Sequence, residues 1–565
     1  MRPICSALVL GLAACGAEPE KLQDSQPVAE PCPTGLTWDN WGEGFFATWC
    51  TSCHSSVVVG DPRYGAPVGV DFDSWEGVFT WSERITVVAT GPTPTMPLID
   101  GVPDVERLLL AEYLACGVDV APIVEAPCAS NMPEPGSVSI ATAADADALC
   151  ERADSVAGNL TITGGSVVLD CLCSVGGDLG IHGTATSVSL GAVASVGGSL
   201  RVSDTEALTS LTAPELVEVG GDLAIERVTG LWSVDLPELD TIGGAVVLAD
   251  TDLVSLFVVD ADSIGLGLTA VRNSDLLDLD FHNVQTIGGD LVVEDNAALV
   301  DLNSFVSLLD VAGGLRLARL ESLQSVNGFE NVVSVGGDLI VNDLEVATWM
   351  TGLDAVANVG GSVSVARIAN LDPIEGLAGL VTVGGDLSFV DLPALVALPT
   401  LDLLSSIGGD LEVVETGVES MLGLLSVTEM GGLRVQDNLS LRALGGLVQP
   451  AEVLGDVTVA GNLGLSKFEI LRNMTHVGGD LVLSDCWEDV STVGLEHLET
   501  VDGSFSIENN LNDVDIDAVL LLDVVGGNFT VVNNPEVPTG SAEALRDRIG
   551  VEDIGGVVTI DGNAP

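Results

Sequence analysis

Positively charged residues are scarce in this sequence. Its 565 residues include 18 Lys and Arg against 83 Asp and Glu, which gives a formal net charge of −65 at pH 7. The phosphates of nucleic acids and anionic membrane surfaces would repel such a chain, so we expect neither as a partner. The excess of acid favours cationic partners or divalent ions, or it simply keeps a scaffold rich in valine and leucine soluble.

Long apolar runs are also missing. Beyond the first fifteen residues no segment contains 18 uncharged apolar residues in a row, so we expect no transmembrane helix. The N-terminus combines Arg2 with an apolar stretch over residues 4–14, which is too short to span a bilayer and has the form of a signal peptide. This stretch ends in LAACG at residues 12–16.

That ending resembles the signal of bacterial lipoproteins, in which the peptide is cut before the cysteine and the cysteine is acylated. The resemblance implies that residues 1–14 are removed, that Cys15 carries the lipid, and that residues 15–31 are a polar tether. Several acyl chains would make the anchor stable. Gly16 fits sorting to the outer membrane in that family, which implies a cell-envelope protein facing the periplasm or the exterior. An ordinary secretory signal is the alternative.

Aromatic residues make up 4% of the chain, and half of them lie within residues 32–120. A second polar segment, residues 121–136, is rich in proline. After it the composition changes to Val, Leu, Gly and Asp with few aromatics. We therefore expect two domains, one over residues 32–120 and the other over residues 137–565, joined by the proline-rich linker.

The most informative motif is the C-x-x-C-H sequence formed by Cys50, Cys53 and His54. Two thiols at this spacing, followed directly by an imidazole, are what covalent attachment of one haem c requires. Each thiol can form a thioether to a vinyl group, and the imidazole can then bind the iron from the proximal side. The motif predicts a redox-active iron in a protein that matures outside the cytoplasm.

The surroundings of the motif resemble the mono-haem class I cytochromes c. Apolar residues at helical spacing over residues 38–49 predict a helix that runs into the motif. Met96, followed by Pro97, lies 42 residues beyond His54, where the resemblance implies the sixth iron ligand. Residues 103–115 read as a closing helix with Leu108, Leu109 and Tyr113 turned inward. The resemblance thus implies a small all-α domain over residues 32–120.

A low-spin iron with both axial positions filled transfers electrons and binds no substrate, so the resemblance implies an electron carrier rather than an enzyme. It would exchange single electrons with a redox partner protein. Weaker interpretations are a thioredoxin-like active site or a zinc site at the same cysteines. Met132 could replace Met96 as the ligand, or the iron could lack a methionine ligand altogether. Arg84 could pair with a haem propionate.

The rest of the chain is a repeat. An apolar residue, usually followed by Gly-Gly, a polar residue and a second apolar residue, recurs mostly every 22–24 residues. Units of this size cannot fold alone and must stack on their neighbours. The first apolar residue of each unit, the repeat mark, falls at eighteen positions: Val156, Val175, Val196, Val219, Ile242, Ile264, Ile287, Val311, Val335, Val359, Val383, Ile407, Met430, Val453, Val477, Val501, Val525 and Ile554.

Each unit predicts a turn followed by a short strand, as in VGGDLI at residues 335–340. Five residues after the first inward Leu there is often an Asn, and stacked Asn side chains can satisfy buried carbonyls along a solenoid. These residues are Asn273, Asn296, Asn438, Asn462, Asn510 and Asn534. Short helices over residues 144–153 and 541–549 would cover sheet edges at the two ends of the array.

The units resemble the receptor L domain, the leucine-rich-repeat-like right-handed β-helix of growth-factor receptors and some microbial surface proteins. The resemblance covers residues 137–565 and implies a right-handed β-solenoid of about 18 coils. It departs at residues 264–267 and 453–456, where the double glycine is lost. An ordinary leucine-rich repeat is the alternative fold.

The solenoid shows no catalytic pattern, since its four histidines are scattered. The Gly-Gly-Asp turns lack the period of calcium-binding repeats, so a calcium site there is a weaker interpretation. We expect the solenoid to act as a spacer or to recognise a redox partner. The rival function is a surface adhesin or ligand-binding solenoid, which holds an envelope or extracellular ligand and in which the haem is secondary.

Seven of the eleven cysteines remain after the signal, the lipid and the haem are accounted for. Most of these seven should be paired in an exported protein. Cys32 and Cys116 bracket the haem segment and are the favoured pair. Cys150 could pair with either Cys171 or Cys173, and the odd total leaves at least one free thiol.

Overall fold

The structure is a computed structural model of the chain. It describes residues 36, 38–51, 54–55, 70–90, 102, 104–114, 132–447, 450, 452–466, 472–486, 495–512 and 514–565. The chain divides into two units, Met1–Ala126 and Pro127–Pro565, which we describe separately. Among the described segments, no helix has both the length and the apolar character needed to cross a bilayer.

The described part of the first unit is helical. Its elements are the π-helical turn η1 (Trp38–Gly42), α1 (Glu43–Trp49), α2 (Trp75–Ile85), the π-helical turn η3 (Thr86–Thr90) and α3 (Asp104–Glu112). The helices predicted before the Cys-x-x-Cys-His motif and at the end of this segment are therefore present. One detail of the prediction is wrong: Leu108 is 71% exposed, while Leu110 is buried together with Tyr113. Leu110 and Tyr113 share a helix face, and Leu108 lies on the opposite one.

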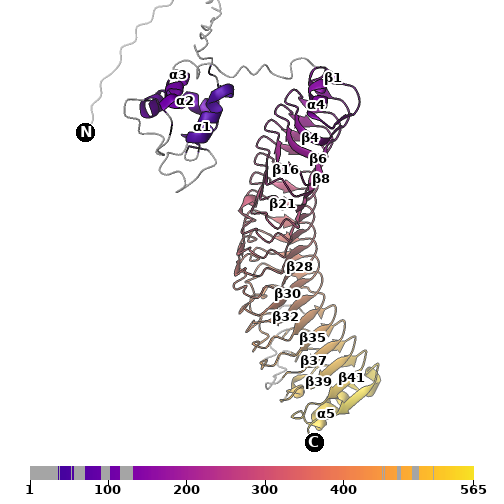
Figure 1. Cartoon of the computed structure of the whole chain (residues 1–565). Coiled ribbons are helices and arrows are strands. Elements are labelled where there is room, and N and C mark those ends of the chain that lie inside the picture. Colours follow the sequence, from indigo (N-terminus) through magenta and orange to yellow (C-terminus); the bar gives the residue numbers. More distant parts are fainter. Residues whose placement is uncertain are drawn as a thin grey trace, which may run out of the picture. The chain divides into compact units, whose positions relative to one another are not determined.

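The second unit is a β-solenoid of about 17 turns. Its coils stack in chain order, from α4 (Ala143–Cys150) at one end to α5 (Thr539–Ile549) at the other (Figure 1). The expected solenoid of about 18 coils is therefore present, and the eighteen repeat marks enclose seventeen intervals. All eighteen marks are buried, none more than 7% exposed.

Sixteen of the eighteen repeat marks lie in two-residue strands that pair in parallel with the equivalent strand of the next coil. Met430 and Ile554 lie outside these strands, and the isolated bridges from Ser406 to Glu429 and from Val525 to Ile554 continue the pairing there. Twelve of the strands with a repeat mark form one sheet together with the strand at Pro133–Glu134, and the other four form a second sheet. In chain order the strands are β1 (Pro133–Glu134), β3 (Ser155–Val156), β5 (Ser174–Val175), β7 (Ser195–Val196), β10 (Glu218–Val219), β13 (Thr241–Ile242), β16 (Ser263–Ile264), β19 (Thr286–Ile287), β21 (Asp310–Val311), β24 (Ser334–Val335), β27 (Asn358–Val359), β29 (Thr382–Val383), β31 (Ser406–Ile407), β34 (Glu452–Val453), β36 (His476–Val477), β38 (Thr500–Val501) and β40 (Val524–Val525).

A second, 20-stranded sheet follows the Gly-Gly turns and is also parallel. Its strands are β2 (Val138–Ile140), β4 (Leu160–Val168), β6 (Leu179–Ser189), β8 (Leu200–Thr205), β9 (Ser210–Thr212), β11 (Leu223–Val228), β14 (Val246–Thr251), β17 (Leu268–Val271), β20 (Leu291–Glu294), β22 (Leu315–Ala318), β25 (Leu339–Asn342), β28 (Val363–Ala366), β30 (Leu387–Leu392), β32 (Leu411–Thr416), β33 (Leu433–Gln436), β35 (Val457–Ala460), β37 (Leu481–Ser484), β39 (Phe505–Glu508), β41 (Phe529–Val532) and β42 (Val558–Asp561).

Shorter elements complete the coils on their third side. They are β12 (Ser233–Asp235), β15 (Ser255–Phe257) and β18 (Asp278–Asp280), which form one small sheet, β23 (Ser325–Val326) and β26 (Trp349–Met350), which form another, and the 3-10 turns η5 (Asn303–Phe305), η6 (Ile516–Ala518) and η7 (Val551–Asp553).

The first glycine of each turn allows adjacent coils to approach closely. A Cβ atom on Gly360 would lie 2.2 Å from the carbonyl oxygen of Gly336, one coil earlier. Real Cβ contacts of this length do not occur, so a side chain here would push the coils apart. After the turn, inward residues such as Leu339 and Val341 alternate with outward ones and fill the interior.

The predicted asparagine ladder is confirmed. Asn273 is fully buried, and its side-chain amide donates to the carbonyl of Leu248 at 3.0 Å and to Oδ1 of Asn296 at 3.1 Å. The main-chain N–H of Asn273 also donates to Oδ1 of Asn296, at 3.0 Å. The same pattern recurs from Asn438 to Asn462. Each Asn thus satisfies main-chain groups that the coil leaves buried.

Both predicted end helices are present. Thr142 and Asp145 form a capping box at the start of α4, and a disulfide joins Cys150 of this helix to Cys171 in the first coil. Of the two partners expected for Cys150 it is therefore Cys171 that is bonded, while Cys173 is engaged in another disulfide. The other end helix, α5, lies between the last two repeat marks and accounts for their longer spacing.

Candidate functional site

The Cys-x-x-Cys-His motif begins where α1 ends. Cys50 caps this helix, and its main-chain N–H donates to the carbonyl of Phe46 at 2.9 Å. The N–H of His54 then donates to the carbonyl of Cys50, also at 2.9 Å. One closed turn of main chain therefore brings Cys50 and His54 together. Both residues are half-buried, and Cys53 lies outside the described residues.

Three further contacts of His54 come from residues 70–72. Nδ1 of the imidazole lies 2.8 Å from the carbonyl oxygen of Val70. The ring of Phe72 stacks on the imidazole with a centroid distance of 4.7 Å and an interplanar angle of 22°. The N–H of Phe72 donates to the carbonyl of His54 at 2.7 Å. Because a carbonyl oxygen only accepts, Nδ1 must carry the proton, and the lone pair of the neutral ring lies on Nε2.

The segment before the motif is joined to the closing helix. The indole N–H of Trp49 in α1 donates to Oε2 of Glu106 in α3 at 2.8 Å. Gly42 lies against the ring of Tyr113, and a Cβ atom there would be 3.0 Å from the ring. Four aromatic rings of this unit are buried in one cluster, those of Phe45, Phe46, Phe72 and Tyr113. These contacts fix the position of helix α1, from whose C-terminal end the motif continues.

Several predicted site residues lie outside the described part of the chain. These are Cys15, Cys53 and Met96, together with the expected disulfide partners Cys32 and Cys116.

The two weaker candidates for roles at the haem are described. Met132 belongs to the solenoid unit, where its N–H donates to Asp154 Oδ1 at 2.8 Å. Arg84 is exposed in the last turn of α2. The sequence analysis did not identify Val70 and Phe72, which contact His54, because they belong to no recognisable motif. Val70 contributes only its main-chain carbonyl, so any residue type at that position could make the same contact.

The solenoid carries a column of alternating charge that the sequence analysis missed. It runs along one corner, four residues after the first inward residue of successive strands, and every member has a positive φ between 50° and 57°. We call it the charge column, and its members are Asp204, Arg227, Asp250, Arg272, Asp295, Arg319, Asp343 and Arg367. The sequence does contain the pattern that could have predicted this column, because Asp and Arg alternate in it at the spacing of the repeat.

Each Arg of the charge column pairs with the Asp one coil earlier. The Nε atoms of Arg272 and Arg319 lie 2.7 and 2.6 Å from the carboxylates of Asp250 and Asp295. The guanidinium of Arg272 holds the pKa of Asp250 below its ordinary value. The side chains in these two pairs are 35–57% exposed, so each pair adds little stability. The four Asp and four Arg of the charge column cancel each other's charge, although the molecule as a whole is very acidic.

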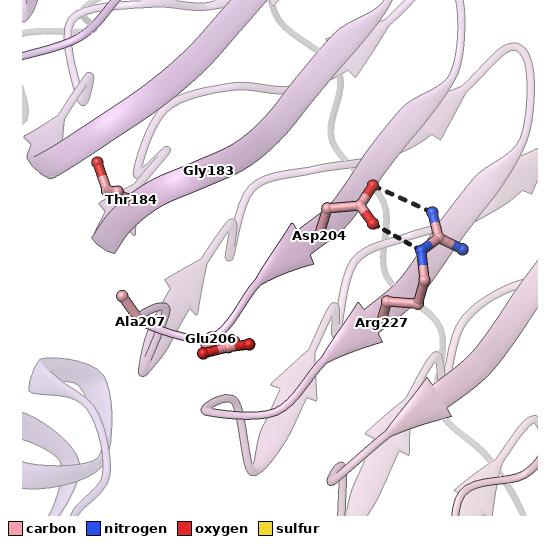
Figure 2. A pocket seen from close by; sticks show the side chains of 6 residues that line it. All are labelled: Gly183, Thr184, Asp204, Glu206, Ala207 and Arg227. Carbon is pink, nitrogen blue, oxygen red and sulfur yellow. Dashed lines mark hydrogen bonds and ion pairs between the residues drawn. The ribbon is translucent and has the colours of Figure 1, made fainter.

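A hollow lies at the start of this column, beside Gly183 (Figure 2). Its lining includes Thr184, Glu206 and the ion pair between Asp204 and Arg227. Arg227 donates to both carboxylate oxygens of Asp204, at 2.6 and 3.1 Å, so that carboxylate is already engaged. The lining residues include no histidine, serine or cysteine, and no hydrogen bond is seen between the Thr184 hydroxyl and the Glu206 carboxylate, so no activated nucleophile is formed there.

The turn aspartates have a structural role. Oδ1 of Asp338 accepts the main-chain N–H of Ser362, one coil later, at 2.8 Å. Oδ1 of Asp456 accepts the N–H of Asp480 in the same way, also at 2.8 Å. Among the described residues no group of three or more His, Cys, Asp or Glu side chains is placed to hold a metal ion. These carboxylates therefore join one coil to the next.

No protein-family model matches the chain, and no curated protein matches it in sequence.

Proposed function

We propose that this protein is a lipid-anchored c-type cytochrome that transfers single electrons through one haem bound at Cys50, Cys53 and His54. The observation that carries the proposal is the state of His54. The carbonyl of Val70 fixes the proton on Nδ1, which leaves the lone pair on Nε2 for iron. A hydrogen bond from the second ring nitrogen is what orients histidine ligands of metals in general.

The residues present fit haem c. A half-buried thiol at Cys50 lies one turn from an imidazole whose tautomer suits ligation. When bound, the haem would supply a reversible one-electron change at its iron. The chain contributes the two thioether bonds, the proximal ligand His54 and, in our proposal, the distal thioether ligand Met96. The ring of Phe72 covers one face of the His54 imidazole and is itself packed against the buried ring of Phe46.

In this proposal the two units have different roles. Cys15 holds the protein at the outer membrane through its acyl chains, and the tether over residues 15–31 lets the cytochrome reach a redox partner protein in the cell envelope. The solenoid serves as a spacer or as the surface that recognises this partner. Its continuous parallel ladders and its buried core support a rigid role.

The test is to export the full chain in cells that mature c-type cytochromes and to record its absorption spectrum. We expect a Soret band and a reduced-minus-oxidised difference, with colour that stays on the protein after acid–acetone extraction. Cys50→Ser with Cys53→Ser should abolish covalent attachment. Cys486→Ser is the matched control, because that thiol lies buried in the solenoid. Colourless wild-type protein, or colour lost on extraction, would refute the proposal.

A second candidate function, ligand binding by the solenoid, is favoured by one exposed apolar column. Trp232 is 73% exposed, and Leu277 and Val300 continue the column at 50% and 43%. Val254 joins them through main-chain hydrogen bonds to Trp232 and Leu277. Exposed apolar patches often mark interaction sites. If binding is the main function, Trp232→Ser should abolish retention of the chain on envelope material, while Trp349→Ser, which is also exposed, should not.

A further inference from the structure

We infer that Phe72 is a positioning residue that sets the plane of the His54 imidazole. The inference rests on the proposed function, since it concerns how this chain presents a ligand to haem iron. The stacked ring of Phe72 and the carbonyl of Val70 meet the imidazole from different sides.

The two contacts restrict the ring together. Rotation of the imidazole about its Cβ–Cγ bond changes the ring plane, so it would break both the 2.8 Å hydrogen bond from Nδ1 to the Val70 carbonyl and the stacking on Phe72 at an interplanar angle of 22°. A tilt of the ring away from Phe72 would break the 4.7 Å stacking contact alone. The 2.7 Å hydrogen bond from the Phe72 N–H to the His54 carbonyl fixes the two main chains relative to each other. Together these contacts fix the direction in which the lone pair of Nε2 points.

Phe72 is itself held in place before any ligand arrives. It is 7% exposed, and its ring lies against that of Phe46 at a centroid distance of 5.9 Å with an interplanar angle of 64°. Helix α2 begins three residues later and presses on the same segment at Gly77. A Cβ atom on Gly77 would lie 2.3 Å from the carbonyl oxygen of Asp71. Helix α2 therefore supports the segment that holds the histidine.

Such support has consequences for the iron. A fixed Nδ1–H···O=C bond raises the basicity of the other ring nitrogen, which favours the ferric state. A fixed ring plane gives a single orientation of the axial ligand and hence a single low-spin spectrum. Without the Phe72 ring the imidazole would sample several orientations, and its hydrogen bond to Val70 would weaken.

The experiment compares Phe72→Leu, Phe72→Tyr and Phe45→Leu in the mature full-length protein. Phe45 is the matched control, because it is buried in the same core and its ring packs against Trp41 and Phe46. We expect covalent haem in all three variants. Phe72→Leu should split or broaden the low-spin electron paramagnetic resonance signal and shift the reduction potential to a more positive value. Phe72→Tyr should keep both as in the wild type, and Phe45→Leu should lower stability while leaving both unchanged.

A second measurement separates the geometry from the haem. In protein made without haem maturation, the ring protons of His54 should show upfield nuclear magnetic resonance shifts from the Phe72 ring. These shifts should be lost in Phe72→Leu and kept in Phe45→Leu. Unshifted ring protons would overturn the inference whatever the haem content. Haem-loaded Phe72→Leu with the signal and potential of the wild type would also overturn it. Upfield shifts in a wild type that binds no haem would refute the proposed function but keep the stacking contact.

Discussion

Asn510 and Asn534 lie one coil apart, and one amide oxygen joins them twice. Oδ1 of Asn534 accepts the main-chain N–H of Asn510 at 3.0 Å and its side-chain amide at 3.1 Å. Oδ1 of Asn510 in turn accepts the N–H of Cys486 at 3.1 Å. Both Asn side chains are fully buried. In this buried hydrogen-bond ladder each Asn uses its donors, and the hydrogen bonds of each Asn depend on the presence of the next one.

Removal of one member should therefore be costly. Asn510→Ala leaves the N–H of Cys486 and the carbonyl of Leu483 without these partners. Each orphaned buried group costs about 1–3 kcal/mol, so we expect a loss of roughly 3 kcal/mol. Chemical denaturation measures it. Asn331→Ala is the control: Asn331 is exposed and donates one bond to Val306, so a comparable loss there would contradict this account.

Cys486 interrupts the ladder between Asn462 and Asn510. Burial raises the pKa of its thiol to about 12, so it stays protonated at neutral pH. Cys486→Asn should supply the missing amide, which would donate to a carbonyl as Asn510 does to Leu483. We expect the free energy of unfolding to rise by about 1 kcal/mol, the net value of one hydrogen bond. Cys486→Leu is the control and should not raise the free energy of unfolding. Equal changes in the two variants would show that the missing amide is not the cause.

Two glycine substitutions should change stability in opposite directions. Gly360→Ala places a Cβ atom 2.2 Å from the carbonyl oxygen of Gly336, so the coils must separate and the protein should lose several kcal/mol, about 3 or more. Gly540→Ala meets no atom within 4 Å and lies in α5, where Ala is favoured by up to about 1 kcal/mol. Thermal denaturation monitored by circular dichroism compares the two variants. A gain in stability for Gly360→Ala would be incompatible with the packing described above.

A carboxylate in the turns should make stability depend on pH. Partial burial, followed by the nearby charge of Asp386, raises the pKa of Asp410 above its ordinary value. The protonated form is therefore favoured in the folded state, and the stability that it contributes below pH about 4 is lost as the pH rises.

Asp410→Asn should consequently be more stable than the wild type at pH 7, by roughly 0.5 kcal/mol once solvent screening is considered. The advantage should shrink at about pH 3, below the ordinary aspartate pKa of about 3.9, because the carboxyl is then mostly protonated in the folded and the unfolded protein. Urea denaturation at the two pH values measures it. Asp402→Asn, at an exposed carboxylate outside these turns, is the control. A wild type that is more stable than Asp410→Asn at pH 7 would refute the prediction.

Local sequence patterns predicted much of the solenoid because each coil repeats the same short-range chemistry. The repeat marks from Val156 to Ile554 are all buried, and the Asn residues five positions after the inward Leu form the expected ladder. The inward face of the closing helix was assigned wrongly at Leu108, since a short helix with three adjacent leucines gives two nearly equivalent faces. Cys53 and Met96 remain predictions, since the structure does not describe them.

The sequence by itself determined the period of the solenoid and its inward residues. Only the tertiary structure decided which side chains meet across the coils and around His54. Asp250 and Arg272 are 22 residues apart in the chain, and Val70 follows His54 by 16. Contacts over such separations depend on how the intervening main chain closes, and no local residue pattern encodes that closure. The tautomer of His54 follows from such a contact, because it is fixed by a carbonyl group that any residue could have supplied.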